Sequence, residues 1–159
     1  PRILNDVVDV NYDRRRDVPK QVEKLLGGDL KGKTVGMLGL AFKENTDDMR
    51  DAPSVDISNA LIAAGAKVRA YDPVAREAAA PHMPAVEIVS DVYEMAKGCD
   101  ALVVVTPWNE FKQIDLEKMK GLLKSPVIYD GRNIYDPARM YEMGFTYRAI
   151  GRPSQNGRA

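Results

Sequence analysis

Beyond Gly27-Gly28 the sequence alternates short β-rich runs with helical segments, and this alternation constrains the fold more than any other feature. It is the pattern of a parallel α/β sheet, because each crossover between parallel strands needs a long connection that is usually a helix. The predicted strands are 34–38, 67–71, 86–89, 101–105, 127–129 and 145–149. The predicted helices between them are 53–64, 74–80, 92–97, 115–123 and 137–143. We therefore predict a doubly wound, Rossmann-like parallel sheet of six strands in the order 3-2-1-4-5-6.

A helix precedes this predicted sheet. Apolar residues recur at helical spacing from Leu4 to Leu26, with a polar interruption at residues 11–17. Because Pro19 lacks an N–H, either the helix kinks there or a second helix begins, capped by Asp17. We assign residues 1–28 to this N-terminal helix, 29–152 to the α/β domain and 153–159 to a flexible tail, which together make one ordinary domain with a helix to spare.

The charge balance and the rare residues exclude several classes of protein. Twenty-three basic residues cancel twenty-three acidic ones, which argues against a protein that coats nucleic acid or an anionic membrane. No apolar run is long enough to span a bilayer, and the start lacks a signal peptide, so we expect a cytoplasmic protein. One cysteine and one histidine cannot build a disulfide framework or a His-rich metal site. A proline start inside a predicted helix suggests that the sequence is part of a longer chain.

In a doubly wound sheet, ligands bind at the carboxyl ends of the strands where the winding reverses, here between the first and fourth strands. The turn after the first strand reads GMLGLAFK over residues 36–43. A standard dinucleotide motif opens directly into a helix, whereas roughly a dozen residues separate Gly39 from the next predicted helix. We therefore do not expect a standard NAD site, and glycines that merely allow tight packing explain the turn equally well.

The loop over residues 42–51 carries two cations near this switch point. Lys43 lies just past the strand end, where its ammonium can meet a diphosphate, and Arg50 can bind a second anionic group. A solvated loop whose acids and bases pair with one another fits the spacing as well. After the fifth strand, Gly131 lets the backbone turn sharply and Arg132 can reach the neighbourhood of Lys43, about 10 Å away at ~4.8 Å per strand. A surface arginine at a strand end is the alternative for Arg132.

The remaining candidates are weaker. Trp108 is more readily explained by packing than by base stacking. Asp72 occupies the position of a ribose-binding acid, but Asp-Pro is also an ordinary turn. Cys99 precedes a buried strand and has no predicted histidine beside it, so we expect a packing role. The sequence thus offers anion-binding groups without a nucleophile and base.

Four motifs in order resemble the C-terminal domain of the UDP-glucose/GDP-mannose dehydrogenase family. They are GLAFKENTDDMRDAPS at residues 39–54, YDP at 71–73, TPWNEF at 106–111 and DGRN at 130–133. The resemblance covers the chain from about Ile3 to Gly151. In that family an N-terminal Rossmann domain binds NAD, a long central helix joins the halves and builds a homodimer, and the C-terminal domain binds the UDP part of a sugar nucleotide.

By this resemblance, residues 1–28 are the end of the central linker and dimerisation helix. Phe42, Lys43 and Arg132 contact the UDP-sugar, and Arg50 reaches the pyrophosphate of NAD across the cleft. The family oxidises the sugar's C6 alcohol to a carboxylate, consuming two NAD, through a covalent intermediate on a cysteine upstream of the central helix. Cys99 does not match that cysteine segment, so we expect no dehydrogenase activity from this chain alone.

The sequences of two of these motifs, TDDMRDAPS and TPWNEF, favour UDP-glucose, oxidised to UDP-glucuronate, as the substrate. UDP-N-acetylmannosamine and GDP-mannose, which other members of the family oxidise, remain alternatives. A freestanding nucleotide-binding module and a dimerisation domain that needs no ligand are further alternatives from other functional classes.

Overall fold

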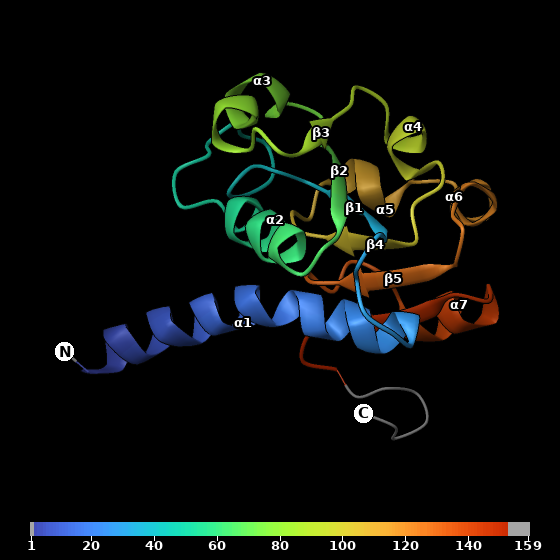
Figure 1. The fold of residues 1–159 in the computed structure, drawn as a ribbon, viewed down its shortest axis with the longest axis horizontal. Coiled ribbons are helices and arrows are strands. Elements are labelled where there is room, and N and C mark those ends of the chain that lie inside the picture. Colours follow the sequence, from blue (N-terminus) through green and yellow to red (C-terminus); the bar gives the residue numbers. More distant parts are fainter. Residues whose placement is uncertain (1, 153–159) are drawn as a thin grey trace.

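The computed structural model describes the backbone of residues 2–152 and the side chains of residues 14–152. These residues form a six-stranded sheet in the order β3-β2-β1-β4-β5-β6, with every pair parallel (Figure 1). The strands are β1 Thr34–Leu38, β2 Lys67–Tyr71, β3 Glu87–Ile88, β4 Ala101–Val104, β5 Val127–Asp130 and β6 Thr146–Ala149. The helices are α1 Arg2–Leu26, α2 Pro53–Ala63, α3 Arg76–Ala79, the 3-10 turn η1 Ala80–His82, α4 Val92–Ala96, α5 Asn109–Lys112, α6 Leu116–Leu122 and α7 Pro137–Glu142. The predicted fold class and strand order are confirmed.

The register of the central strands brings their carboxyl ends to one edge of the sheet. Leu38 of β1 pairs with Val104 of β4, and Val104 pairs with Asp130 of β5. The winding reverses between β1 and β4, since β1 also pairs with β2 on its other side. The loops that follow β1, β4 and β5 therefore leave the sheet side by side, at the switch point where ligands bind in such folds.

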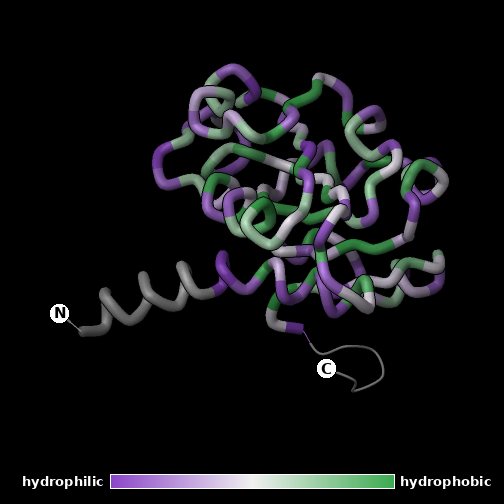
Figure 2. Tube along the Cα trace, viewed as in Figure 1, coloured by the Kyte–Doolittle hydropathy of each residue, from purple (hydrophilic) through white to green (hydrophobic). Residues whose placement is uncertain are grey.

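Side chains alternate along the strands and build a core on each face of the sheet. Val35, Met37 and Val103 are buried on the face covered by α1, α2 and α3. Leu38 and Leu102 are buried on the face covered by α4, α5, α6 and α7. Figure 2 shows hydrophobic residues concentrated in the inner strands and hydrophilic ones in the outer loops. Burial on both faces explains why the predicted strand 101–105 is continuously apolar in sequence.

The N-terminal helix is continuous through its proline. α1 runs from Arg2 to Leu26 with Pro19 inside it, so of the two alternatives considered, a second helix capped by Asp17 is wrong. The carboxylate of Asp17 instead accepts a hydrogen bond from the Gln21 side chain at 2.8 Å. Val18 and Val22 are buried against the α/β domain, and such packing stabilises a helix more than its intrinsic propensity does.

Several element boundaries differ from the predicted ones. The third helix begins at Arg76, because the carboxylate of Asp72 accepts the N–H groups of Val74 and Ala75 and holds them in a turn. The short helix α5 was not predicted, and β3 is two residues long. The predicted tail, 153–159, lies outside the described residues. Across the part of the chain that the structure describes, no helix has the length and apolar character needed to cross a membrane.

Candidate anion-binding site at the switch point

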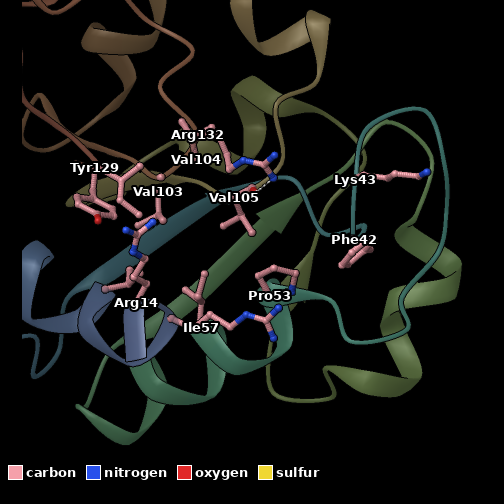
Figure 3. Close-up of a pocket in the computed structure, with 14 residues that line it drawn as sticks. Arg14, Phe42, Lys43, Pro53, Ile57, Val103, Val104, Val105, Tyr129 and Arg132 are labelled. Atoms are coloured by element: carbon pink, nitrogen blue, oxygen red, sulfur yellow. Dashed lines mark hydrogen bonds between the residues drawn. The ribbon is translucent and has the colours of Figure 1, made fainter. Parts of the chain in front are cut away.

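A cavity of about 380 Å³ opens at the switch point (Figure 3). Its floor is the apolar end of β4 and the residue after it, Val103 to Val105, and its walls come from α1, α2 and the loops after β1 and β5. It is lined by Arg14, Arg15, Val18, Phe42, Lys43, Pro53, Ile57, Val103, Val104, Val105, Tyr129, Gly131, Arg132 and Ile150. Its volume falls within the range of small-molecule sites, roughly 300 to 1,000 Å³.

The charged residues that line this cavity are all basic. They are Arg14, Arg15, Lys43 and Arg132, and no Asp or Glu stands among the described lining residues. The chain as a whole is neutral, so this is a local concentration of positive charge. A cavity with an apolar floor and basic walls suits a ligand that has both a flat apolar part and an anionic part.

The loop after β1 is held by a buried aspartate at the end of β2. One carboxylate oxygen of Asp72 accepts the N–H groups of Leu40 at 2.8 Å and Ala41 at 3.1 Å. The same oxygen accepts the indole N–H of Trp108 at 3.2 Å. Asp72 therefore shapes the backbone immediately before Phe42, and Trp108 is a buried packing residue, as the sequence predicted.

A close approach between two loops fixes the start of this segment. Gly39 has a φ of +99°, and a Cβ at that position would lie 2.4 Å from the side chain of Thr106. The Thr106 hydroxyl donates to the carbonyl of Ala41 at 2.9 Å. The glycines of this turn thus serve close packing, and α2 begins only at Pro53, so its N-terminus does not follow the turn directly. The predicted mismatch with a standard dinucleotide motif is borne out by this geometry.

Phe42 and Lys43 lie where this loop reaches the cavity. Phe42 is 43% exposed, which is unusual for a large apolar side chain, and it lies at the cavity wall. In Figure 3 the Lys43 side chain extends away from the centre of the cavity. Lysine has a flexible four-carbon stem, so its ammonium can swing toward a bound anion.

The loop after β5 is held by a second buried aspartate. The two carboxylate oxygens of Asp130 accept the N–H groups of Arg132, Ile134 and Tyr135 at 3.0, 2.8 and 3.1 Å. The hydroxyl of Tyr147 donates to the same carboxylate at 2.6 Å. Burial and this hydrogen bond raise the pKa of Tyr147 well above its usual range, so the hydroxyl remains a donor.

Gly131 lets this loop pass close to β4. A Cβ on Gly131 would lie 2.7 Å from the carbonyl oxygen of Val104, to which the Gly131 N–H donates at 3.1 Å. Arg132 follows at once, and its guanidinium donates to the carbonyl of Val105 at 3.4 Å over the cavity floor. The structure therefore brings Phe42, Lys43 and Arg132, from two separate loops, to one cavity.

Arg50 lies apart from the other predicted site residues. Its side chain is 91% exposed, does not line the cavity, and pairs with Asp48 at 2.9 Å. Hydrogen bonds from the Arg50 side chain lower the pKa of Asp48 from 3.8 to about 2. The arginine is thus presented to solvent from the tip of the loop, and the internal ion pair considered for this loop does form.

Two arginines of α1 line the cavity, and the sequence reasoning missed both. Residues 11–17 looked like a polar interruption of the helix, yet α1 turns Arg14 and Arg15 toward the α/β domain. The available signal was a run of three arginines that ends two residues before a buried valine, Val18. Arg15 pairs with Asp56 at 2.8 Å and with Asp51 at 3.3 Å, so it also ties the helix to α2.

The described residues contain no alternative centre for covalent or metal chemistry. Cys99 is fully buried and burial raises its pKa to about 11, so it is a neutral thiol packed in the core, as predicted. His82 is exposed at the end of η1. No three His, Cys, Asp or Glu side chains among these residues are grouped to hold a metal ion. The arrangement can bind and position an anionic ligand.

Comparison with known proteins gives consistent matches. Residues 36–137 match the family model of the UDP binding domain of the UDP-glucose/GDP-mannose dehydrogenase family. The UDP-glucose 6-dehydrogenase of Rhizobium meliloti is 42% identical over 152 residues, which are 96% of this chain and 35% of that protein. The UDP-glucose 6-dehydrogenase TuaD of Bacillus subtilis is 43% identical over 159 residues, covering 98% of this chain and 34% of that protein.

A solved structure shows the same fold. The NDP-N-acetyl-D-galactosaminuronic acid dehydrogenase of Methanosarcina mazei superposes with a TM-score of 0.77 at 30% identity, over 93% of this chain and 30% of that one. The chain spans about a third of the length of the curated relatives it matches.

Proposed function

Because the chain belongs to the UDP-glucose/GDP-mannose dehydrogenase family, we propose that it binds the UDP part of the substrate in an NAD-dependent UDP-glucose 6-dehydrogenase. The whole enzyme would oxidise UDP-glucose to UDP-glucuronate. The observation that carries the proposal is the cavity at the switch point, whose basic side chains come from α1 and from two separate loops.

Each residue of the cavity would contact a different part of a nucleoside diphosphate. Arg132, with its planar guanidinium, binds phosphate or ribose, and Lys43 swings in to pair with the diphosphate. Phe42, exposed at the wall, packs on the ligand's apolar surface and loses its contact with water. The floor from Val103 to Val105 excludes water beneath the ligand, which strengthens each of these charge interactions.

NAD would accept a hydride in each of the two oxidations. This chain fits only one part of a dinucleotide site, because its glycine turn does not lead directly into α2. Arg50 is suited to meet the pyrophosphate of a cofactor held by another part of the protein, since its guanidinium is exposed and partnered only by Asp48 among the described residues. When the cofactor binds, the Arg50 guanidinium would exchange its ion pair with Asp48 for one with a phosphate of the cofactor.

The proposed function also implies how this chain is connected to the rest of the enzyme. We infer that α1 is the end of a central helix that joins this domain to an N-terminal NAD domain and builds a homodimer. The catalytic cysteine would lie in that other part, since Cys99 is buried and protonated. The cytoplasm is the expected compartment, where sugar nucleotides and NAD are both at hand.

Titration calorimetry of the full-length protein with UDP tests this proposal. We expect Lys43→Ala and Arg132→Ala each to weaken UDP binding by about 10- to 150-fold, the loss expected for one charge-assisted hydrogen bond of ~1.5 to 3 kcal/mol. Lys112→Ala is the matched control, because Lys112 is exposed on α5 and does not line the cavity.

The nucleotide preference is part of the same experiment. UDP-glucose and UDP should bind more tightly than GDP-mannose and GDP, whereas a preference for GDP would assign the chain to the GDP-mannose branch. Unchanged affinity in both cavity variants would contradict the proposed site.

A further inference from the structure

α1 presents three consecutive arginines to three different surroundings. Successive residues of an α-helix point about 100° apart, so Arg14, Arg15 and Arg16 cannot share one role. Arg14 and Arg15 line the cavity, whereas Arg16 is exposed and does not. The three residues therefore form a natural comparison of one side chain in three places.

Arg15 is committed to holding the helix in place. Its side chain is only 13% exposed, and its guanidinium lies between the carboxylates of Asp56 and Asp51. It also donates to the backbone carbonyl of Asp51 at 3.3 Å. Two carboxylates offset the positive charge of Arg15, so this residue adds little to the attraction of an anionic ligand.

Arg14, unlike Arg15, has no carboxylate partner in the part of the chain that the structure describes. Among the described residues it forms no ion pair and no hydrogen bond, and it does not pair with Asp17, whose carboxylate accepts from Gln21. Figure 3 shows its side chain reaching from α1 toward Tyr129, at the wall of the cavity. Its positive charge is close enough to act on the Tyr129 hydroxyl, whose pKa burial nevertheless raises. Among the described residues, no carboxylate forms an ion pair with Arg14, although Asp17 lies near it at the Tyr129 side.

The position of Arg14 complements that of Arg132. Arg132 enters from the loop after β5 and Arg14 from α1, with the valines of β4 between them as a floor (Figure 3). A diphosphate carries more negative charge than one guanidinium offsets, so a second unpaired arginine on another wall would stabilise it further.

We propose that Arg14 binds the anionic part of the ligand directly, so that α1 is a third wall of the UDP site. This inference rests on the proposed function. It has a structural consequence: the bound nucleotide bridges α1 and the two loops, and its binding stabilises the docking of the helix on the α/β domain.

The test compares Arg14→Ala with Arg16→Ala in the full-length protein. Both variants remove one arginine from α1, but only the first removes it from the cavity. We expect Arg14→Ala to weaken UDP binding by about tenfold or more, as loss of a hydrogen bond to a charged group does, and Arg16→Ala to change it by less than about twofold. Arg14→Glu should weaken it further, since it places a like charge beside the diphosphate, and Arg14→Lys should recover part of the affinity.

Uridine, which has no phosphate, provides the second readout. Arg14→Ala should leave uridine binding unchanged, because the lost contact is to the anionic part. Equal effects of Arg14→Ala and Arg16→Ala on UDP, or an equal loss for uridine and UDP, would overturn the inference while leaving the proposed function intact if Lys43→Ala and Arg132→Ala still weaken UDP binding. Failure of the unaltered protein to bind UDP would overturn both.

Discussion

At the scale of single residues, two buried aspartates organise the loops that carry the site. Asp72 at the end of β2 accepts hydrogen bonds from the loop after β1, and Asp130 at the end of β5 accepts them from the loop that follows it. Both carboxylates are fully buried, and each offers several lone pairs to backbone N–H groups. A carboxylate at a strand end can thus hold a loop that lines the cavity without lining the cavity itself.

The Asp130 network makes a stability prediction. Asp130→Asn keeps one carbonyl oxygen but replaces the other acceptor with an NH2 group. One carboxylate oxygen accepts from the Arg132 N–H and the other accepts from Ile134, Tyr135 and Tyr147, so the amide cannot serve both sets of donors. We expect the free energy of unfolding to fall by about 2 to 4 kcal/mol, the cost of leaving buried donors unsatisfied. Urea unfolding followed by circular dichroism measures it.

Asp47→Asn is the control for that measurement, since Asp47 is exposed in the same chain and should tolerate the change within about 0.5 kcal/mol. If the unfolding midpoint of Asp130→Asn matched that of this control, Asp130 would not organise the loop.

At the scale of elements, α1 combines two functions that sequence periodicity does not separate. Its apolar residues Val18 and Val22 pack on the domain, and Arg15 fastens it to α2 through Asp56. The spacing of the apolar residues predicted a helix here. It could not predict that the helix continues through Pro19, because that depends on tertiary packing.

Loss of the Arg15 contacts should loosen the helix. Arg15→Gln keeps a polar side chain, which is shorter, and removes the charge that pairs with Asp56 and Asp51. We expect amide hydrogen exchange in residues 14–22 to speed up about fivefold, equivalent to ~1 kcal/mol, the upper part of the range for partly exposed ion pairs. Mass spectrometry measures this exchange in the unaltered protein, in Arg15→Gln and in the control Arg16→Gln. If Arg16→Gln accelerated exchange equally, the loss of any positive charge, and not the loss of the ion pair, would be responsible.

At the scale of the whole molecule, the strand order was predictable because the apolar runs are short, regular and separated by helical segments. Parallel strands buried on both faces leave that signature in sequence, and the right-handed crossover rule then restricts the order. The switch point followed from the order, and with it the loops of Lys43 and Arg132.

The sequence could not predict which residues from distant parts of the chain meet at the site. The arrival of Arg14 at the cavity depends on how α1 docks, and the burial of Asp72 depends on Trp108, a residue more than thirty positions away. Neither docking nor long-range pairing has a local sequence pattern, so an aspartate before a proline looks like an ordinary turn until the loops are placed.

The central claim is that basic side chains from separate corners of the fold hold a uridine diphosphate at the switch point, and nuclear magnetic resonance tests it most directly. With the chain labelled with nitrogen-15, titration with UDP should shift the backbone amides of residues 40–43, 103–106 and 131–132, together with those near Arg14, and leave the amides of α3 and α6 unchanged. The method detects binding as weak as millimolar, so it does not depend on other parts of the protein adding affinity. Saturating UDP that moves none of these amides, or that moves only amides distant from the cavity, would contradict the account.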